Sequence, residues 1–67
     1  MQNRKMKMAR AECGLSQGEL AEKVGASRQT ISMIEAGKFN PSLKLCLSIC
    51  RAMGKTLDEL FWEGGET

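Results

Sequence analysis

Hydrophobic residues recur every three or four positions along most of this chain, in segments that end at glycine or proline. Gly14, Gly25, Gly37, Pro41 and Gly54 divide the sequence into pieces of roughly 8 to 12 residues. Apolar residues at this spacing lie on one side of an α-helix, because the helix turns once every 3.6 residues. The alternation typical of β-strands is absent before the C-terminus. The pattern therefore predicts an all-α chain.

The first segment combines an apolar stripe with a basic residue. Met6, Ala9, Arg10 and Cys13 fall on one side at helical spacing. An arginine within such a stripe requires a partner, because an unpaired charge at the margin of a core is costly. The same spacing places Glu35 at the edge of the buried side of a later helix. We expect an Arg10–Glu35 ion pair; the alternative is that both charges are solvated at the surface.

Capping signatures indicate where the second and third helices begin. The stretch LSQGEL contains a capping box and a hydrophobic staple, formed by two residue pairs: Ser16 with Glu19, and Leu15 with Leu20. Gly25 suits the left-handed turn that ends this helix. Ser27 is a favourable N-cap for the helix that follows.

The stretch SRQTISMIEAGK, residues 27–38, has two different faces when it is drawn as a helix. Ile31 and Ile34 point inward. The outward side carries three polar residues and a methionine: Arg28, Gln29, Ser32 and Met33. This face is either ordinary solvated surface or a surface that recognises a binding partner.

The C-terminal part predicts two further helices. Asn40 and Pro41 match an N-cap followed by proline at the first helical position, so we expect the fourth helix to start there and to run to about Met53. Its apolar side is expected to comprise Leu43, Cys46, Leu47, Ile49, Cys50 and Met53, with Leu45 left over. These are more apolar residues than one stripe needs, so some are candidates for contact with a second subunit.

A second capping box, TLDE at residues 56–59, predicts a short fifth helix that contains Leu57, Leu60 and Phe61. The final residues, WEGGET, are either frayed or a short strand.

Residues 17–36 form a unit of helix, glycine-containing turn and helix. Ala21 is small enough to let the two helices cross closely, Gly25 turns the chain, and Ile31 fills the angle between the helices. This arrangement is typical of a helix-turn-helix. The outward face of its second helix also suits base recognition, because Arg28 can donate two hydrogen bonds to guanine and Gln29 can pair with adenine.

Composition and charge exclude several other functions. The chain has 67 residues, ten of them basic and eight acidic, with no histidine and three cysteines that lack CxxC spacing. We therefore expect one small domain over residues 1–67, with no metal site, no disulfide framework and no cofactor. An enzyme is not expected, because no nucleophile has a recognisable base and no glycine loop suits a phosphate. Regulation through oxidation of Cys13, Cys46 or Cys50 is a separate hypothesis.

No apolar run approaches the length of about 20 residues that spans a bilayer, and the basic start is not followed by an apolar signal core. We therefore expect a cytoplasmic protein without a membrane partner.

The stretch SQGELAEKVGASRQTISMIEAGKFNPSL resembles the phage repressor and Cro type of helix-turn-helix, the xenobiotic-response-element family of regulators. The resemblance extends over about residues 4 to 61 and is strongest to the small homodimeric cytolysin repressor among the members of the family. It implies a five-helix, lambda-repressor-like DNA-binding domain whose third helix enters the major groove. A small sheet between the chain ends, with Met1 to Lys5 against a strand in residues 61–65, is also compatible with it.

Carried over position by position, the resemblance implies roles for four groups of residues. Base-reading positions are Arg28, Gln29, Ser32 and Met33. Positions that contact the DNA backbone are Gln17, Ser27, Thr30, Lys38 and Asn40. Dimer-interface positions are Asn40, Pro41, Leu43, Leu47, Thr56, Leu57 and Leu60, and Arg10 and Glu35 match the buried ion pair. Met33 departs from the family pattern, where a polar residue is common, and suits an apolar contact such as a thymine methyl group.

The resemblance therefore implies a sequence-specific transcriptional regulator, a repressor, that binds a palindromic double-stranded operator as a homodimer. An autoregulator, a restriction-system controller and an antitoxin all fit, so a toxin or a co-regulator is an open protein partner. A different class of function is a protein-interaction module, in which the outward face of residues 27–38 docks a protein. The salt dependence of binding separates these hypotheses, because phosphate contacts release counterions.

Overall fold

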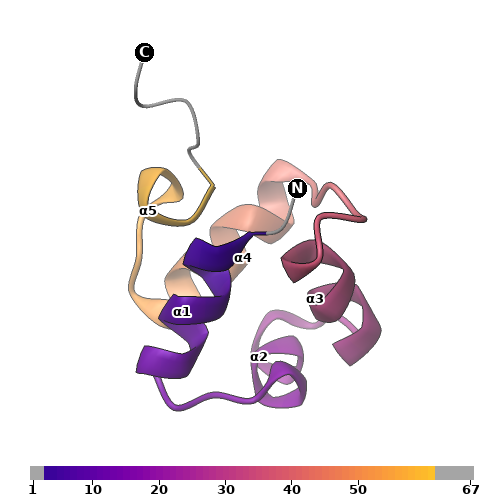
Figure 1. Cartoon of the computed structure of the whole chain (residues 1–67), viewed down its shortest axis with the longest axis horizontal. Coiled ribbons are helices and arrows are strands. Elements are labelled where there is room, and N and C mark those ends of the chain that lie inside the picture. Colours follow the sequence, from indigo (N-terminus) through magenta and orange to yellow (C-terminus); the bar gives the residue numbers. More distant parts are fainter. Residues whose placement is uncertain (1–2, 62–67) are drawn as a thin grey trace.

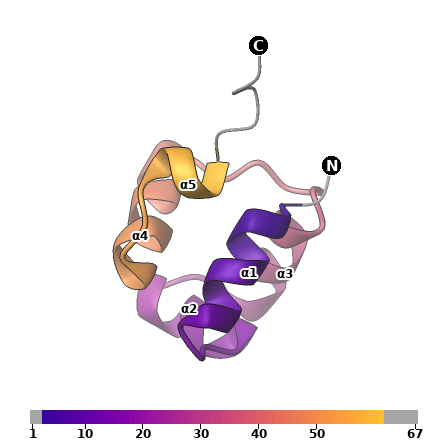
Figure 2. The same ribbon diagram turned by 60° about the vertical axis from the view of Figure 1, so that its left-hand side comes forward.

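The structure, a computed structural model, describes residues 3–61, which fold into five α-helices and no strand (Figure 1). The helices are α1 (Arg4–Glu12), α2 (Gln17–Val24), α3 (Arg28–Glu35), α4 (Leu43–Met53) and α5 (Leu57–Phe61). α2 packs against α3 and α4, while α5 packs against α1 and α4 (Figure 2). The predicted all-α fold class is confirmed.

The predicted sheet of the chain ends is wrong where the structure describes it. Arg4 and Lys5 are helical, because the Asn3 side chain accepts a hydrogen bond from the backbone N–H of Met6 at 3.0 Å and starts α1 there. Phe61, the first residue of the predicted strand, is the last residue of α5. Residues 1–2 and residues 62–65 of this prediction lie outside the described part of the chain.

Each helix contributes to one apolar core. The buried hydrophobic residues are Met6, Ala9, Leu20, Ala21, Ile31, Ile34, Ile49, Cys50, Met53 and Leu60. Leu15 packs against this cluster from the start of α2, next to the fully buried Leu20, as expected for a hydrophobic staple. Burial of apolar surface supplies most of the free energy that holds these short helices together.

Local hydrogen bonds and backbone conformation start and end several helices as the sequence predicts. Ser16 accepts the backbone N–H of Glu19 at 3.0 Å, and the Glu19 carboxylate accepts that of Ser16 at 2.8 Å. Gly25 ends α2 with a φ of 73°, a left-handed conformation that favours glycine. A second reciprocal pair, between Thr56 and Glu59, starts α5.

The predicted start of α4 at Asn40 and Pro41 is wrong. α4 begins at Leu43, and its N-cap is Ser42, whose hydroxyl oxygen accepts the backbone N–H of Leu45 at 3.2 Å. A helix with Pro41 at its first position would require Ser42 to be helical. Ser42 instead has extended backbone angles, φ −66° and ψ 162°, which free its side chain to cap the helix.

The apolar side of α4 also differs from the expectation. Leu45, which was left over, packs against the core, whereas Leu43 and Leu47 are 65% and 39% exposed. The assignment of Leu60 to a dimer interface is wrong as well. Leu60 is 2% exposed, because α5 lies against both α1 and α4 and this side chain points into the core.

Candidate nucleic-acid interface

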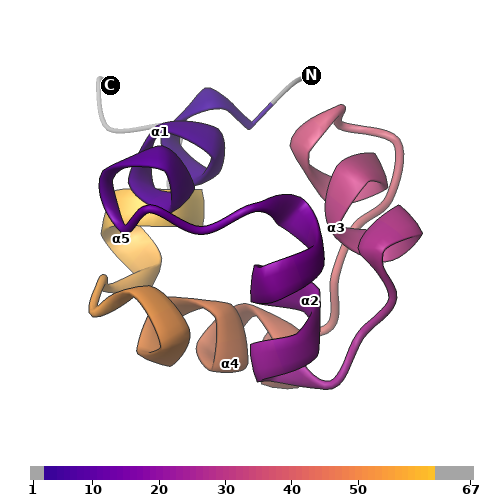
Figure 3. The same cartoon turned by 90° about the horizontal axis from the view of Figure 1, so that it is seen from below.

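α3 lies at one edge of the molecule (Figure 3). Polar residues on its outward side are exposed. Arg28, Gln29 and Ser32 are exposed and Met33 is half-buried. The opposite side of the helix is fixed, since Ile31 is fully buried and Ile34 is 3% exposed. The structure thus brings the four predicted base-reading residues together on one helix.

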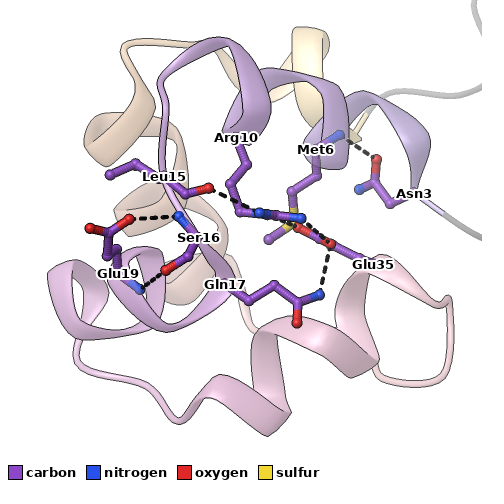
Figure 4. Close-up of polar contacts among 8 residues, drawn as sticks. All are labelled: Asn3, Met6, Arg10, Leu15, Ser16, Gln17, Glu19 and Glu35. Carbon is purple, nitrogen blue, oxygen red and sulfur yellow. Dashed lines mark hydrogen bonds and ion pairs between the residues drawn. The ribbon is translucent and has the colours of Figure 1, made fainter.

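A single carboxylate fixes the position of α3 relative to α1 and α2 (Figure 4). Arg10 of α1 donates from Nε to Oε2 of Glu35 at 2.7 Å and from Nη2 to Oε1 at 3.2 Å. Gln17 of α2 donates its side-chain N–H to the same Oε1 at 3.1 Å. A third bond, from Arg10 Nη1 to the carbonyl of Leu15 at 2.9 Å, occupies the other end of the guanidinium. The ion pair expected from the sequence is therefore present and extends to a second helix.

The side chains of Arg10 and Glu35 are largely buried, but their polar atoms have hydrogen-bond partners. The side chains of Arg10 and Glu35 are 14% and 5% exposed, so each would be costly without the other. No buried side-chain nitrogen or oxygen within residues 3–61 lacks a hydrogen-bond partner. The backbone of Glu35 is held too, because its carbonyl accepts the N–H of Asn3 at 2.9 Å.

Ser27, one of the predicted backbone-contacting residues, caps α3 and contacts another of them, Thr30. The Ser27 hydroxyl oxygen accepts the backbone N–H of Thr30 at 3.1 Å and lies 2.9 Å from the Thr30 hydroxyl oxygen. Ser27 is exposed and Thr30 is half-buried. Lys38 and Asn40 are exposed in the connection that follows α3, so they lie at the opposite end of that helix from Ser27.

Gln17, the remaining predicted backbone contact, lies in a hollow that the sequence did not indicate. The hollow has a volume of about 210 Å³ and is lined by Lys7, Gln17, Ser32, Glu35 and Ala36. Lys7 was not among the predicted site residues. The available signal was its position three residues before Arg10, which places both side chains on neighbouring parts of one helix face.

The predicted dimer residues other than Leu60 are accessible. Leu43 and Leu47 are one turn apart on the outer side of α4, Asn40 and Thr56 are exposed, and Pro41 and Leu57 are half-buried. Phe39, in the connection before α4, is a further exposed apolar residue, with 42% of its surface exposed.

None of the three cysteines is part of α3. Burial raises the pKa of the Cys46 thiol. Burial, together with the charges of Cys46 and Glu59, raises the pKa of the Cys50 thiol. Cys13 is exposed and lies 3.6 Å from the carbonyl of Met53. Raised pKa values leave less of the reactive thiolate at neutral pH, which disfavours Cys46 and Cys50 as redox sensors.

Residues 3–61 contain no group of three potential ligands placed to hold a metal ion. No helix in the same range is long and apolar enough to cross a membrane.

Comparisons with known proteins agree with this geometry. A family model described as helix-turn-helix matches residues 6–60. The HTH-type transcriptional regulator YgzD of Bacillus subtilis is 47% identical over 58 residues, which cover 87% of this chain and 88% of YgzD. MJ0272 of Methanocaldococcus jannaschii, also named an HTH-type transcriptional regulator, is 47% identical over 57 residues, with 85% of this chain and 86% of MJ0272 covered.

The fold has a close counterpart among solved structures. The restriction-modification controller protein C.AhdI from Aeromonas hydrophila superposes with a TM-score of 0.81 at 33% sequence identity, over 87% of this chain and 88% of that protein. The resemblance to regulators of the phage repressor and Cro type is thereby confirmed. The chain belongs to the helix-turn-helix family of DNA-binding transcriptional regulators.

Proposed function

We propose that this protein is a homodimeric repressor that recognises a palindromic operator by placing α3 of each subunit in the DNA major groove. The observation that carries the proposal is the division of α3 into two sides. Ile31, Ile34 and Glu35 hold the helix to the rest of the molecule, while Arg28, Gln29 and Ser32 are exposed. A reading helix needs both properties, because base contacts discriminate only if the helix is held rigidly.

The exposed side chains offer complementary base contacts. Arg28 can donate a bidentate pair of hydrogen bonds to O6 and N7 of guanine, and Gln29 can pair with N6 and N7 of adenine. Ser32 can donate or accept, and Met33 suits the methyl group of thymine. Each good bidentate contact discriminates against a wrong base by about 1 to 3 kcal/mol.

Contacts to the sugar-phosphate backbone orient the helix in the groove. Ser27 and Thr30 at the start of α3, Gln17 at the start of α2, and Lys38 and Asn40 after α3 are assigned this role. The position of these residues supports the assignment, because they lie at the ends of the exposed side of α3 rather than on it. Such contacts fix orientation and register and carry little sequence information.

A dimer would bury exposed leucines of α4. Leu43 and Leu47 are large, exposed and one turn apart on α4, and Asn40, Pro41, Thr56 and Leu57 complete the assigned interface. A two-fold symmetric pair presents two reading helices about 34 Å apart, which corresponds to one turn of DNA. Symmetry of the protein then requires a palindromic site.

The proposed role as a repressor follows from occupation of the operator DNA by the dimer. A dimer bound over two successive major grooves excludes other proteins from the same DNA, which makes repression the simplest outcome when the operator overlaps a promoter. C.AhdI, which is named a restriction-modification controller protein, supports a role in gene control for a chain with this fold.

The test is selection of bound sequences from a random pool of DNA, followed by anisotropy titrations with the selected duplex. Arg28→Ala and Gln29→Ala should lower affinity for that duplex and relax the base preference, without change in the thermal unfolding midpoint. Arg51→Ala is the matched control, because Arg51 is an exposed arginine on α4. Unchanged base preference in both α3 variants would refute the assignment of α3. Absence of DNA binding at low salt would favour the protein-docking alternative.

A further inference from the structure

α2 and α4 pack against each other, and a hollow lies between them (Figure 3). This α2–α4 hollow has a volume of about 350 Å³ and is lined by Lys23 of α2 and by Ser48, Arg51 and Ala52 of α4. None of these residues belongs to α3 or to the positions assigned to DNA contact. The hollow is therefore separate from the proposed reading surface.

Lys23 and Gln17 lie on different sides of α2. Six residues separate them along the chain, which corresponds to about 120° around an α-helix. Gln17 accordingly donates a hydrogen bond to Glu35 of α3, whereas Lys23 lines the hollow with residues of α4. A molecule in the α2–α4 hollow would thus approach the domain from another side than DNA bound to α3.

The α2–α4 hollow carries two positive charges and no carboxylate among its lining residues. Neither Lys23 nor Arg51 makes an ion pair or a side-chain hydrogen bond with another residue of the range 3–61. Glu19, one turn before Lys23 on α2, already accepts the backbone N–H of Ser16 at 2.8 Å. α4 itself contains no acidic residue. The two cations therefore lack a counter-charge from their own helices.

Two other hollows on the described part of the chain also contain lysine, but each contains carboxylates as well. Their charged residues are Lys7 and Glu35 in one, and Lys5, Glu12, Lys55 and Glu59 in the other. In the second of these, Lys55 Nζ lies 3.4 Å from a carboxylate oxygen of Glu12. The α2–α4 hollow differs from both, because its positive charge is left to interact with an anion from outside the chain.

We propose that the α2–α4 hollow binds the phosphate group of a small phosphorylated molecule. The planar guanidinium of Arg51 can donate two parallel hydrogen bonds to phosphate oxygens, Lys23 supplies a second positive charge, and the half-buried Ser48 can donate its hydroxyl. A phosphomonoester carries a charge of about −1.5 to −2 at neutral pH. Two cations match this charge better than they match that of a monocarboxylate.

The size and position of the hollow suit a small effector molecule. Its volume of about 350 Å³ lies near the lower end of the range of roughly 300 to 1,000 Å³ that is typical of small-molecule sites. An occupant contacts α2, which belongs to the helix-turn-helix unit, and α4, which carries Leu43 and Leu47 of the proposed dimer surface. The inference does not rest on the proposed function, because binding of a phosphomonoester is measured without DNA.

The experiment follows the backbone amide chemical shifts of the protein by NMR during titration with glycerol phosphate, in a phosphate-free buffer at constant ionic strength. Acetate, a monocarboxylate, is the control ligand. The proteins are wild type, Lys23→Gln, Arg51→Gln, Arg51→Lys and Lys7→Gln. Lys7→Gln is the matched control, because Lys7 is an exposed lysine of α1 outside this hollow and the substitution changes the net charge equally. Circular dichroism on each variant confirms that the comparison is made between folded proteins.

Glycerol phosphate should shift the amide signals of Lys23, Ser48 and Arg51 in a saturable way in the wild type, and acetate should not. Lys23→Gln and Arg51→Gln should each weaken binding by about tenfold or more, because each removes a charge-assisted hydrogen bond. Arg51→Lys should lie between wild type and Arg51→Gln, since lysine keeps the charge but not the planar fork. Lys7→Gln should bind as the wild type does.

Three results would overturn the site. The first is no saturable shift with glycerol phosphate, or equal shifts with acetate. The second is an equal weakening in Lys7→Gln and Arg51→Gln, because the effect is then one of total charge. The third is a shift of the same amides by a random-sequence duplex of about 20 base pairs, roughly two turns of DNA, but not by glycerol phosphate, which would make the hollow a DNA contact. All three leave the assignment of α3 to its own test, the base preference of Arg28→Ala and Gln29→Ala.

Discussion

Arg10 and Glu35 meet at 2.7 Å across 25 residues of sequence, and their largely buried side chains join α1 to α3. A buried pair of this kind is costly to break on one side, because the remaining charge then has no partner. The bond is therefore more important for the placement of α3 than its net contribution to stability alone would indicate.

The first prediction concerns this pair. Glu35→Met should reduce the free energy of unfolding by about 3 kcal/mol, because Arg10 is left unpaired. The double variant Arg10→Met/Glu35→Met should recover part of that loss, since no lone charge remains. Urea denaturation measures both. The control is Glu12→Gln, which removes the exposed Glu12–Lys55 pair at 3.4 Å and should cost about 1 kcal/mol or less. Equal losses in Glu35→Met and the control would contradict the prediction.

The second prediction separates the observed N-cap of α4 from the expected one. Ser42→Ala should destabilise the protein by about 1 kcal/mol, because the backbone N–H of Leu45 loses its acceptor at 3.2 Å. Asn40→Ala should leave the unfolding midpoint nearly unchanged. Thermal denaturation followed by circular dichroism gives both values. A larger effect at Asn40 than at Ser42 would place the helix start where the sequence suggested it.

The third prediction tests the proposed dimer surface. Leu47→Glu places a charge in an interface assigned to Leu43 and Leu47, and should weaken self-association by at least about tenfold, since burial of a leucine is worth roughly 1.5 to 3 kcal/mol. Sedimentation velocity across a concentration series measures this. Met8→Glu is the control, because Met8 is 63% exposed but lies on α1. If both variants associate as the wild type does, α4 is not the interface.

The fourth prediction concerns pH. The backbone N–H of Thr56, donated to the Glu59 carboxylate at 2.8 Å, lowers the pKa of that carboxyl; desolvation opposes the effect, while the Thr56 hydroxyl and the charge of Lys55 add to it. A lowered pKa means that the stabilisation is present above the unfolded pKa, about 4.3, and is lost as the pH falls through the folded pKa.

Glu59→Gln, which keeps a hydrogen-bond acceptor but not the charge, should therefore be less stable than wild type at pH 6 and equal to it at about pH 3. Urea midpoints at the two pH values measure the difference. A gap of the same size at both pH values would show that the charge of Glu59 is not involved. Glu22→Gln gives the same charge change at an exposed position on α2 and serves as the control.

The fifth prediction concerns thiol reactivity. Cys13 is exposed, whereas Cys50 is buried and burial raises the pKa values of the Cys46 and Cys50 thiols. At neutral pH iodoacetamide should therefore modify Cys13 first, Cys46 more slowly, and Cys50 only as the protein unfolds. Mass spectrometry of peptides from a time course gives the order. Rapid modification of Cys50 in the folded protein would contradict the assigned burial.

The sequence predicts features that depend on a few neighbouring residues. The capping box of Ser16 and Glu19, the left-handed turn at Gly25 and the cap at Ser27 each require only a short pattern, and each is present. The Arg10–Glu35 contact was also predictable. Both residues lie at the margin of an apolar stripe, where few other residues of opposite charge could pair with either of them.

The features that could not be predicted correctly from the sequence are those for which several similar residues could take the same role. Asn40 and Ser42 are both good N-caps, and only the observed backbone angles select Ser42. Apolar residues lie almost all round α4, so periodicity alone does not decide that Leu45 is inside and Leu43 outside. The position of Lys7 in the hollow depends on how α1 packs beside α3, and its spacing from Arg10 along the helix does not determine that packing.

The attachment of α3 through Glu35 has a practical consequence for engineering. The residues that hold the helix and the residues proposed to read bases occupy different sides of it, so the latter can be varied as a set. A library randomised at Arg28, Gln29, Ser32 and Met33 should consist mainly of folded members, and selection on different duplexes would then sample binding preference without first having to repair stability. In a chain of 67 residues, that separation makes the domain a compact starting point for new DNA specificities.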